Sequence, residues 1–310
     1  MAIMFSNEII KEYRKTRQLT LSELSDGICD LTTLRRIEKG ERAPSVYLFR
    51  KLMNRLGLAP SKFYANVASK EEIIFFNLYY EIEALVMGRK YDEAHAKISE
   101  LHKLELDLSK KEGKKIREQL VSVLLCSISQ GKNEDAQKRK EASKYALGLT
   151  LSGFCEDKIS EYMLSYEEIS LLNALALAYL SAGDSPKDID ILHQVKKSMD
   201  KFYSDEYEKS RGYVLTLFNL STALGYAQRH TESLKISNIG IEQSIKHKRL
   251  YLLPHLKFNK ACALYFLDEH ENVAKLAIEA VFALRNNEEF DDADERQKFA
   301  EEVMGINFPL

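Results

Sequence analysis

Hydroxyl and basic side chains are concentrated in one short stretch of the sequence, LTTLRRIEKGER, which runs from Leu31 to Arg42. An arginine offers two N–H groups that match the edge of guanine or a phosphate, and a threonine offers a hydroxyl and a methyl group to base edges. On a helix, Leu31, Thr32, Thr33 and Arg36 would face outward from its N-terminal half. This set of side chains suits the reading of a DNA major groove.

Other basic residues of the same stretch are suited to a different task. Lysine and arginine side chains that neutralise backbone phosphates add affinity and salt dependence without reading the base sequence. We assign Arg35, Lys39 and Arg42 to such contacts. For Arg35 the alternative is a solvated helix residue without any contact to DNA, because exposed charges are common.

Local signals place three short helices around this stretch. The segment TLSE, Thr20 to Glu23, is a capping box that starts a second helix, after a first helix that begins near Ser6. Gly27 allows the chain to turn, and Asp30 is placed to cap a third helix. A second and a third helix joined by a tight turn form a helix-turn-helix.

The third helix is expected over residues 31–39, with Leu34 and Ile37 facing inward. Gly40 fits the left-handed position that closes a helix. A fourth helix begins after Ser45 and buries an apolar face formed by Leu48, Phe49, Leu52 and Leu56. In modules of this type the N-terminal half of the third helix enters the major groove.

The charges divide the chain into a basic head and an acidic body. Residues 1–65 contain twelve lysines and arginines against seven acidic residues, which leaves +5, and the remaining 245 residues carry −7. A basic head on an acidic body indicates a polyanionic partner for the head alone. A surface that is uneven by chance is the alternative.

The stretch LTLSELSDGICDLTTLRRIEKGERAPS resembles the helix-turn-helix of phage repressors, and its IC and RIEKG segments resemble the Rgg and PlcR-like peptide-responsive regulators. The resemblance implies a framework ion pair between Glu38 and Arg14. It departs at Leu21, where the family often carries a glutamine that touches phosphate. Thr20 and Ser22 are therefore the remaining side chains of the second helix that we assign to DNA.

Residues 66–310 show helical periodicity interrupted by short turns, and the turns recur. Taking Gly88, Gly131, Gly183, Gln228 and Asp268 as the turns gives spacings of 43, 52, 45 and 40 residues. These are helix pairs with a somewhat elongated tetratricopeptide period. The expected fold is all-α: a helix-turn-helix domain over residues 1–65, then a right-handed superhelix of about five tetratricopeptide-like pairs and a C-terminal capping helix.

A stacked superhelix presents a concave surface to which extended peptides bind. Asn173, Asn219 and Asn259 recur at the same relative place in three successive first helices, and an asparagine amide can bond a peptide backbone. Each asparagine could instead satisfy a neighbouring helix. Charge for a ligand carboxylate is expected from Arg211, Lys257 and Lys260. The aromatic run FFNLYY, residues 75–80, suits either this surface or the core.

Several protein classes are not supported by the sequence. It contains no GxxxxGK[ST], GxGxxG, HExxH or GxSxG motif, so an enzyme is not expected. The four cysteines and seven histidines lack ligand spacing, and no cofactor or metal is expected. The acidic run at 288–295 is interpreted as solvated surface, with metal binding as the less favoured alternative. No secretion signal or apolar span of membrane length occurs, which indicates a cytoplasmic protein.

We therefore expect a transcription regulator that binds double-stranded DNA and senses a short peptide. The resemblance implies a homodimer, a two-fold symmetric operator and a secreted, re-imported signalling peptide, as in quorum sensing. Peptide binding would favour one curvature of the superhelix and reset the distance between the two heads. The alternative is a tetratricopeptide scaffold that docks a protein partner, with DNA binding for autoregulation only.

Overall fold

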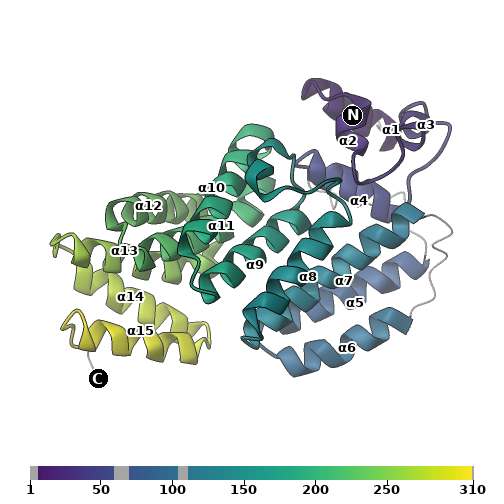
Figure 1. The fold of residues 1–310 in the computed structure, drawn as a ribbon. Helices are drawn as coiled ribbons and strands as arrows, with labels where there is room; N and C mark the ends of the chain where they lie inside the picture. The colour runs from purple at the N-terminus through teal and green to yellow at the C-terminus, as the bar shows by residue number, and fades with distance from the viewer. Residues whose placement is uncertain (1–5, 59–69, 104–110, 309–310) are drawn as a thin grey trace.

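A computed structural model describes residues 6–58, 70–103 and 111–308, and every regular element in these ranges is a helix. Figure 1 shows a small group of N-terminal helices above one end of a longer array of helix pairs. None of the described helices is long and apolar enough to cross a membrane. The predicted all-α arrangement, with a helix-turn-helix followed by helical repeats, is confirmed.

The N-terminal helices follow the predicted signals, except that Asp30, at the N-cap of the third helix, forms no side-chain capping hydrogen bond. They are α1 (Ser6–Thr16), α2 (Leu21–Ser25), α3 (Leu31–Glu38) and α4 (Val46–Arg55). The capping box of α2 is formed, since the Thr20 hydroxyl accepts from the Glu23 amide at 3.1 Å and the Glu23 carboxylate accepts from the Thr20 amide at 2.7 Å. Gly27 and Gly40 have φ values of +65° and +74°, as expected of the turn and the helix end.

Five helix pairs and a final helix form the rest of the described chain. The pairs are α5 (Lys70–Met87) with α6 (Tyr91–Lys103), α7 (Lys111–Gly131) with α8 (Ala136–Gly148), α9 (Tyr166–Ser181) with α10 (Ser185–Phe202), α11 (Glu206–Tyr226) with α12 (His230–Lys246), and α13 (Leu253–Phe266) with α14 (Val273–Asn286). Two short 3-10 helices, η2 (Glu156–Glu161) and η3 (Leu250–Leu252), lie in the connections. Helix α15 (Phe290–Glu302) ends the array, as predicted for a capping helix.

The turns within the pairs lie at or beside the predicted positions. Gly183, Gln228 and Asp268 adopt positive φ, between +58° and +82°. In the first pair Arg89 takes the left-handed conformation in place of Gly88. In the second pair Gly131 is the last residue of α7, and Asn133, two residues later, takes the left-handed conformation.

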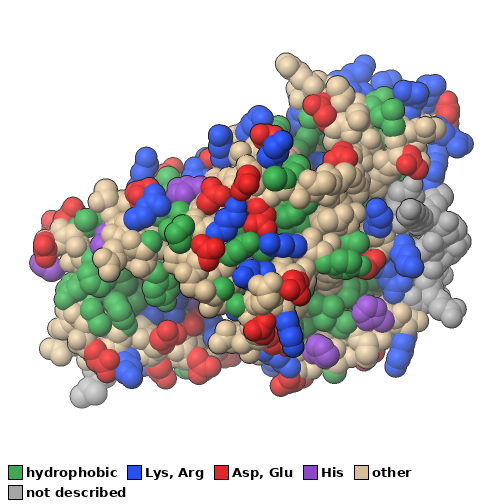
Figure 2. Space-filling model, in the orientation of Figure 1, with side chains coloured by type: hydrophobic (Ala, Val, Ile, Leu, Met, Phe, Trp, Pro, Cys, Tyr) green, Lys and Arg blue, Asp and Glu red, His purple; other side chains and the backbone are tan. Residues whose placement is uncertain are grey.

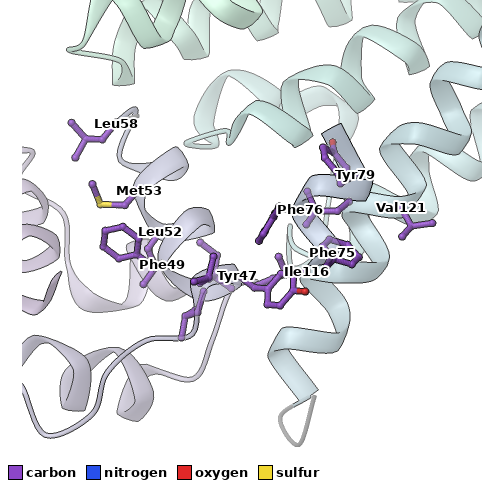
Figure 3. Packing of buried hydrophobic residues seen from close by; sticks show 14 of the residues in the cluster. Tyr47, Phe49, Leu52, Met53, Leu58, Phe75, Phe76, Tyr79, Ile116 and Val121 are labelled. Carbon is purple, nitrogen blue, oxygen red and sulfur yellow. The ribbon is translucent and has the colours of Figure 1, made fainter. Parts of the chain in front are cut away.

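One apolar cluster runs from the N-terminal helices into the first repeats. Tyr47 of α4 lies 5.3 Å from the ring of Phe75 and 5.2 Å from that of Phe76 on α5, and Figure 3 shows this contact. Phe75, Phe76 and Tyr79 are buried, so these residues of the FFNLYY run belong to the core, whereas Tyr80 is exposed. The predicted boundary at residues 65 and 66 lies outside the described residues, and the packing beside it is continuous.

Candidate functional site

Helix α3 presents the predicted outward face to solvent. Leu34 and Ile37 are fully buried, whereas Leu31, Thr32, Arg35 and Arg36 are exposed. Lys39, directly after the helix, is also exposed, and Thr33 and Arg42 are half-buried. Figure 2 shows lysine and arginine side chains gathered at the upper right of the molecule, where Figure 1 places these helices.

Two of the basic side chains on this face share one acidic neighbour. The guanidinium of Arg36 and the ammonium of Lys39 lie 3.8 Å and 3.7 Å from the carboxylate of Glu41. Their side chains keep more than half of their surface exposed, and exposed ion pairs of this kind contribute little. Both groups therefore stay available to an anionic ligand.

Glu38 belongs to the framework of the module, as the resemblance implies. Its two carboxylate oxygens accept from the Arg14 guanidinium at 2.6 Å and 2.7 Å, and Arg14 also donates to the carbonyl of Leu19 at 2.7 Å. The hydrogen bonds that Arg14 donates to Glu38 raise the pKa of Arg14, against the effect of burial. This ion pair joins α1 to α3 and so fixes the recognition face.

Thr20 and Ser22, the predicted contacts of α2, are both exposed. The Thr20 hydroxyl is already engaged in the capping box, where the Thr20 amide and hydroxyl lower the pKa of Glu23. The nine predicted DNA contacts therefore lie on neighbouring parts of the module, and their role stays a prediction.

A buried ionic cluster joins α4 to the start of α9, and we call it the junction. Arg50 donates to Glu167 at 3.1 Å, Arg55 donates to Glu168 at 2.8 Å, and the ammonium of Lys51 lies 3.3 Å from Glu168. All five side chains are almost wholly buried. Burial acts to raise the pKa of Glu168, but Arg55 and Lys51, with hydrogen bonds from Ser165 and Thr150, outweigh it and lower this pKa to about 2.

The junction corrects the charge argument for the head. Arg50, Lys51 and Arg55 are three of its twelve basic residues, and they are buried against repeat glutamates. Their charges are not available to a polyanion. The basic character of the exposed surface rests instead on the residues around α3.

The predicted asparagines are bonded to neighbouring helices. Asn219 donates to the side-chain oxygen of Asn173 at 2.9 Å, and Asn173 donates to Thr216 at 3.0 Å. Both asparagines are buried. Asn259 is half-buried and donates to Ser221 and Thr222 at 2.8 Å. These contacts favour the structural alternative for Asn173 and Asn219, and a ligand role for the three stays a prediction.

The predicted cations of the repeats have separate environments. Arg211 lies 4.3 Å from the ring centre of Tyr166 and 3.6 Å from Glu208. Lys257 pairs with Glu279 at 2.8 Å, and Lys260 is half-buried on α13. These contacts do not bring Arg211, Lys257 and Lys260 together at one binding site.

Arg211 is part of a group that the sequence did not indicate, and we call it the inner cluster: Glu83 of α5, Tyr166 of α9, Arg211 of α11 and Tyr251 of η3. Burial raises the pKa of Tyr166, the charge of Glu83 adds to this, and Arg211 opposes it. Burial likewise raises the pKa of Tyr251. Tyr166 and the charge of Glu83 raise it further. The four side chains come from three helix pairs and from the η3 connection, and these mutual effects, with the contact of Arg211 on Tyr166, indicate that they lie near one another.

Tyr251 is partly open to solvent although neighbouring protein affects its hydroxyl. Nearly half of the residue is accessible, at 48%, although the surrounding protein raises the pKa of its hydroxyl. Glu83 behaves similarly, because it is half-buried and burial raises the pKa of its carboxyl against the charges of Arg50 and Arg211. The inner cluster thus combines acid, base and phenol groups that a polar ligand can reach.

Comparison with known proteins agrees with this architecture. Residues 10–63 match the family model described as helix-turn-helix. The structure of PlcR from Bacillus thuringiensis in complex with the peptide PapR7 and DNA is similar, with a TM-score of 0.61 and 23% identity over 94% of this chain and 98% of that chain. The apo form of the same protein gives a TM-score of 0.56 and 22% identity over 96% and 98% of the two chains.

The structure of a second protein is similar over nearly the whole length as well. ComR from S. thermophilus in complex with DNA and its signalling peptide ComS gives a TM-score of 0.53 and 16% identity, covering 97% of this chain and 100% of that chain. None of the curated protein sequences matches this chain. At these identities the likeness shows that this chain has the same fold, and residues 10–63 are a helix-turn-helix domain.

Proposed function

We propose that this chain is a cytoplasmic transcription regulator that binds duplex DNA through α3 and binds a short peptide through its helical repeats. The observation that carries the proposal is the outward face of α3, where Thr32 and Arg36 are exposed on a module held by the Arg14–Glu38 ion pair. The solved relatives with this fold were crystallised with DNA and a peptide, which supports the same pair of ligands here.

The inner cluster supports the peptide half of the proposal. A short peptide offers backbone amides, a terminal ammonium and a terminal carboxylate, and the cluster offers phenol, carboxylate and guanidinium groups near one another. Two copies of the chain would place two α3 helices on the half-sites of a two-fold operator. Peptide binding regulates DNA binding only if the peptide prefers one of two arrangements of this dimer.

Replacing Arg36 with Ala should weaken binding to the operator by about 1–3 kcal/mol, because it removes a guanidinium group that can bond a base or a phosphate from the outward face of α3. The operator is first obtained by selecting duplexes from a random pool with the full-length protein. Affinity for the selected duplex is then measured by fluorescence anisotropy at several salt concentrations.

Arg285→Ala is the matched control, since Arg285 is a partly exposed arginine of the repeats that pairs with Asp294. We expect it to leave the affinity unchanged. If Arg36→Ala binds the selected duplex as tightly as the wild type, Arg36 does not belong to the recognition surface.

Calorimetric titration tests the peptide half. Synthetic short peptides, including any that are encoded by small reading frames beside the gene, are titrated into the full-length protein. Saturable binding by one of them, with a change in DNA affinity, is the expected result. If all of them fail while a folded protein partner co-purifies, the repeats are a docking scaffold and the peptide half is wrong.

A further inference from the structure

Three potential metal ligands meet where α15 begins. His255 of α13 and Glu289 and Asp292 at the first turn of α15 each offer one ligand atom, and these atoms all lie within 4.8 Å of one another. Glu289 and Asp292 are three residues apart, so their side chains share one side of the helix start. The acidic run that the sequence presents as solvated surface therefore includes two carboxylates that lie against a buried imidazole.

The imidazole of His255 is only partly satisfied by the protein. The residue is 5% exposed, and its Nε2 lies 3.2 Å from a carboxylate oxygen of Glu289. Its Nδ1 is buried and finds no hydrogen-bond partner among the described residues. Nε2, the ring nitrogen that faces Glu289, is therefore the one placed to bind an ion, and a neutral imidazole is the commonest protein ligand of transition metals.

The donor set fits one class of ion. A nitrogen and two carboxylate oxygens suit Zn²⁺ and similar divalent transition metals, whereas Ca²⁺ and Mg²⁺ prefer oxygen ligands alone. Donors held by one zinc ion at about 2.1 Å lie roughly 3.4 Å apart, so modest side-chain rotations from the observed spacing complete the site. From these observations we propose that His255, Glu289 and Asp292 bind one divalent transition-metal ion of the Zn²⁺ type.

Two arginines compete with the ion for Asp292. Arg296 lies 3.4 Å from the carboxylate on the same helix, and Arg89 from the turn between α5 and α6 forms an ion pair with it. With both arginines in place the cluster has no net charge, so one of them must leave for an ion to enter favourably. Arg89 is the more exposed of the two, with 44% of its side chain accessible, and it can move into solvent.

Metal binding would therefore affect a contact between the two ends of the repeats. Arg89 belongs to the first helix pair and Asp292 to the last helix, 203 residues apart in the chain. An ion on Asp292 takes the place of Arg89 and breaks this connection between the two ends of the repeats. The inference does not depend on DNA or peptide binding.

Titration of ZnCl₂ into chelator-treated full-length protein, followed by calorimetry, tests the site. We expect one equivalent to bind, and His255→Gln and Glu289→Gln to weaken binding at least about tenfold. Arg89→Ala should bind Zn²⁺ about tenfold more tightly, because it removes the competing charge. A merely structural cluster does not predict this gain.

Two matched variants separate the site from other histidines and arginines. His270→Gln removes an exposed histidine that lies 3.9 Å from Asp268, and Arg285→Ala removes an arginine that pairs with Asp294 of the same α15. Neither should change the affinity. The proposal is overturned if the protein does not bind one equivalent, or if Glu289→Gln binds Zn²⁺ as tightly as the wild type. The Glu289 side chain is partly exposed, so we expect this variant to fold.

Discussion

Replacing Glu168 with Gln is expected to lower the free energy of unfolding by about 3–5 kcal/mol, the usual cost of removing one partner from a buried ion pair. Glutamine keeps the shape of the side chain but not its charge. Lys51 and Arg55 would then remain almost wholly buried with their nearest carboxylate gone. Urea unfolding followed by circular dichroism measures the loss.

Glu232→Gln is the matched control for this change. Glu232 pairs with Arg229 through two hydrogen bonds of 2.6 Å and 2.7 Å, but both side chains are more than 40% exposed. Removing its charge should cost about 0–1 kcal/mol. If the two variants lose the same stability, the junction contributes no more than a surface pair.

The low pKa of Glu168 also predicts how this difference depends on pH. The carboxyl has a pKa of about 2 in the folded protein and about 4.3 in an unfolded chain, so its contribution is present above about pH 4.3. That contribution is lost as the pH falls from there toward 2, by up to about 3 kcal/mol. The free energies of unfolding of the wild type and of Glu168→Gln should therefore become more similar as the pH is lowered from 7 to 4 and 3.

Features set by neighbours in sequence were predictable. The Thr20–Glu23 capping box and the turn at Gly27 depend on residues a few positions apart, and the structure confirms both. The end of α3 at Gly40 has the same local origin and is also confirmed. The repeat turns follow the same rule, because each is marked by a glycine or polar residue between two periodic segments.

Features that depend on distant residues were not predictable from pattern alone. The junction pairs Lys51 with Glu168, which are separated by more than one hundred residues, and no local signal distinguishes a buried lysine from an exposed one. The inner cluster needs Glu83, Tyr166 and Tyr251 to converge through the curvature of the repeats. The three asparagines were found by their recurrence, but recurrence could not tell that Asn173 and Asn219 bond each other.

The junction matters for the proposed regulation because it lies between α3 and the inner cluster, the two surfaces that we propose bind ligands. Arg50 contacts both Glu167 and, through its guanidinium, the rings of Tyr79 and Tyr80 on α5. The charges of Glu167 and Arg50 in turn act on the pKa of Arg211 in the inner cluster. We expect the effect of a ligand at the inner cluster to be transmitted to the helix-turn-helix through these contacts.

Replacing Gly27 with Ala is expected to cost about 2–5 kcal/mol of unfolding free energy, because two effects add. The residue has φ +65°, a left-handed conformation that costs an alanine about 1–2 kcal/mol. A Cβ there would also lie 1.5 Å from the backbone oxygen of Thr150, in the repeats, and such overpacking typically adds about 1–3 kcal/mol. The side chain therefore pushes the helix-turn-helix away from the repeats.

Gly153→Ala separates the two effects. Gly153 has nearly the same φ, +64°, but no atom lies within 4 Å of the position its Cβ would take. Its alanine variant should show the backbone cost alone, so the difference between the two variants measures the clash at Thr150. Hydrogen exchange should then be faster at residues 147–151 and in α4 of Gly27→Ala only. Equal losses in the two variants, with unchanged exchange in α4, would mean that contact at Gly27 does not hold the two parts together.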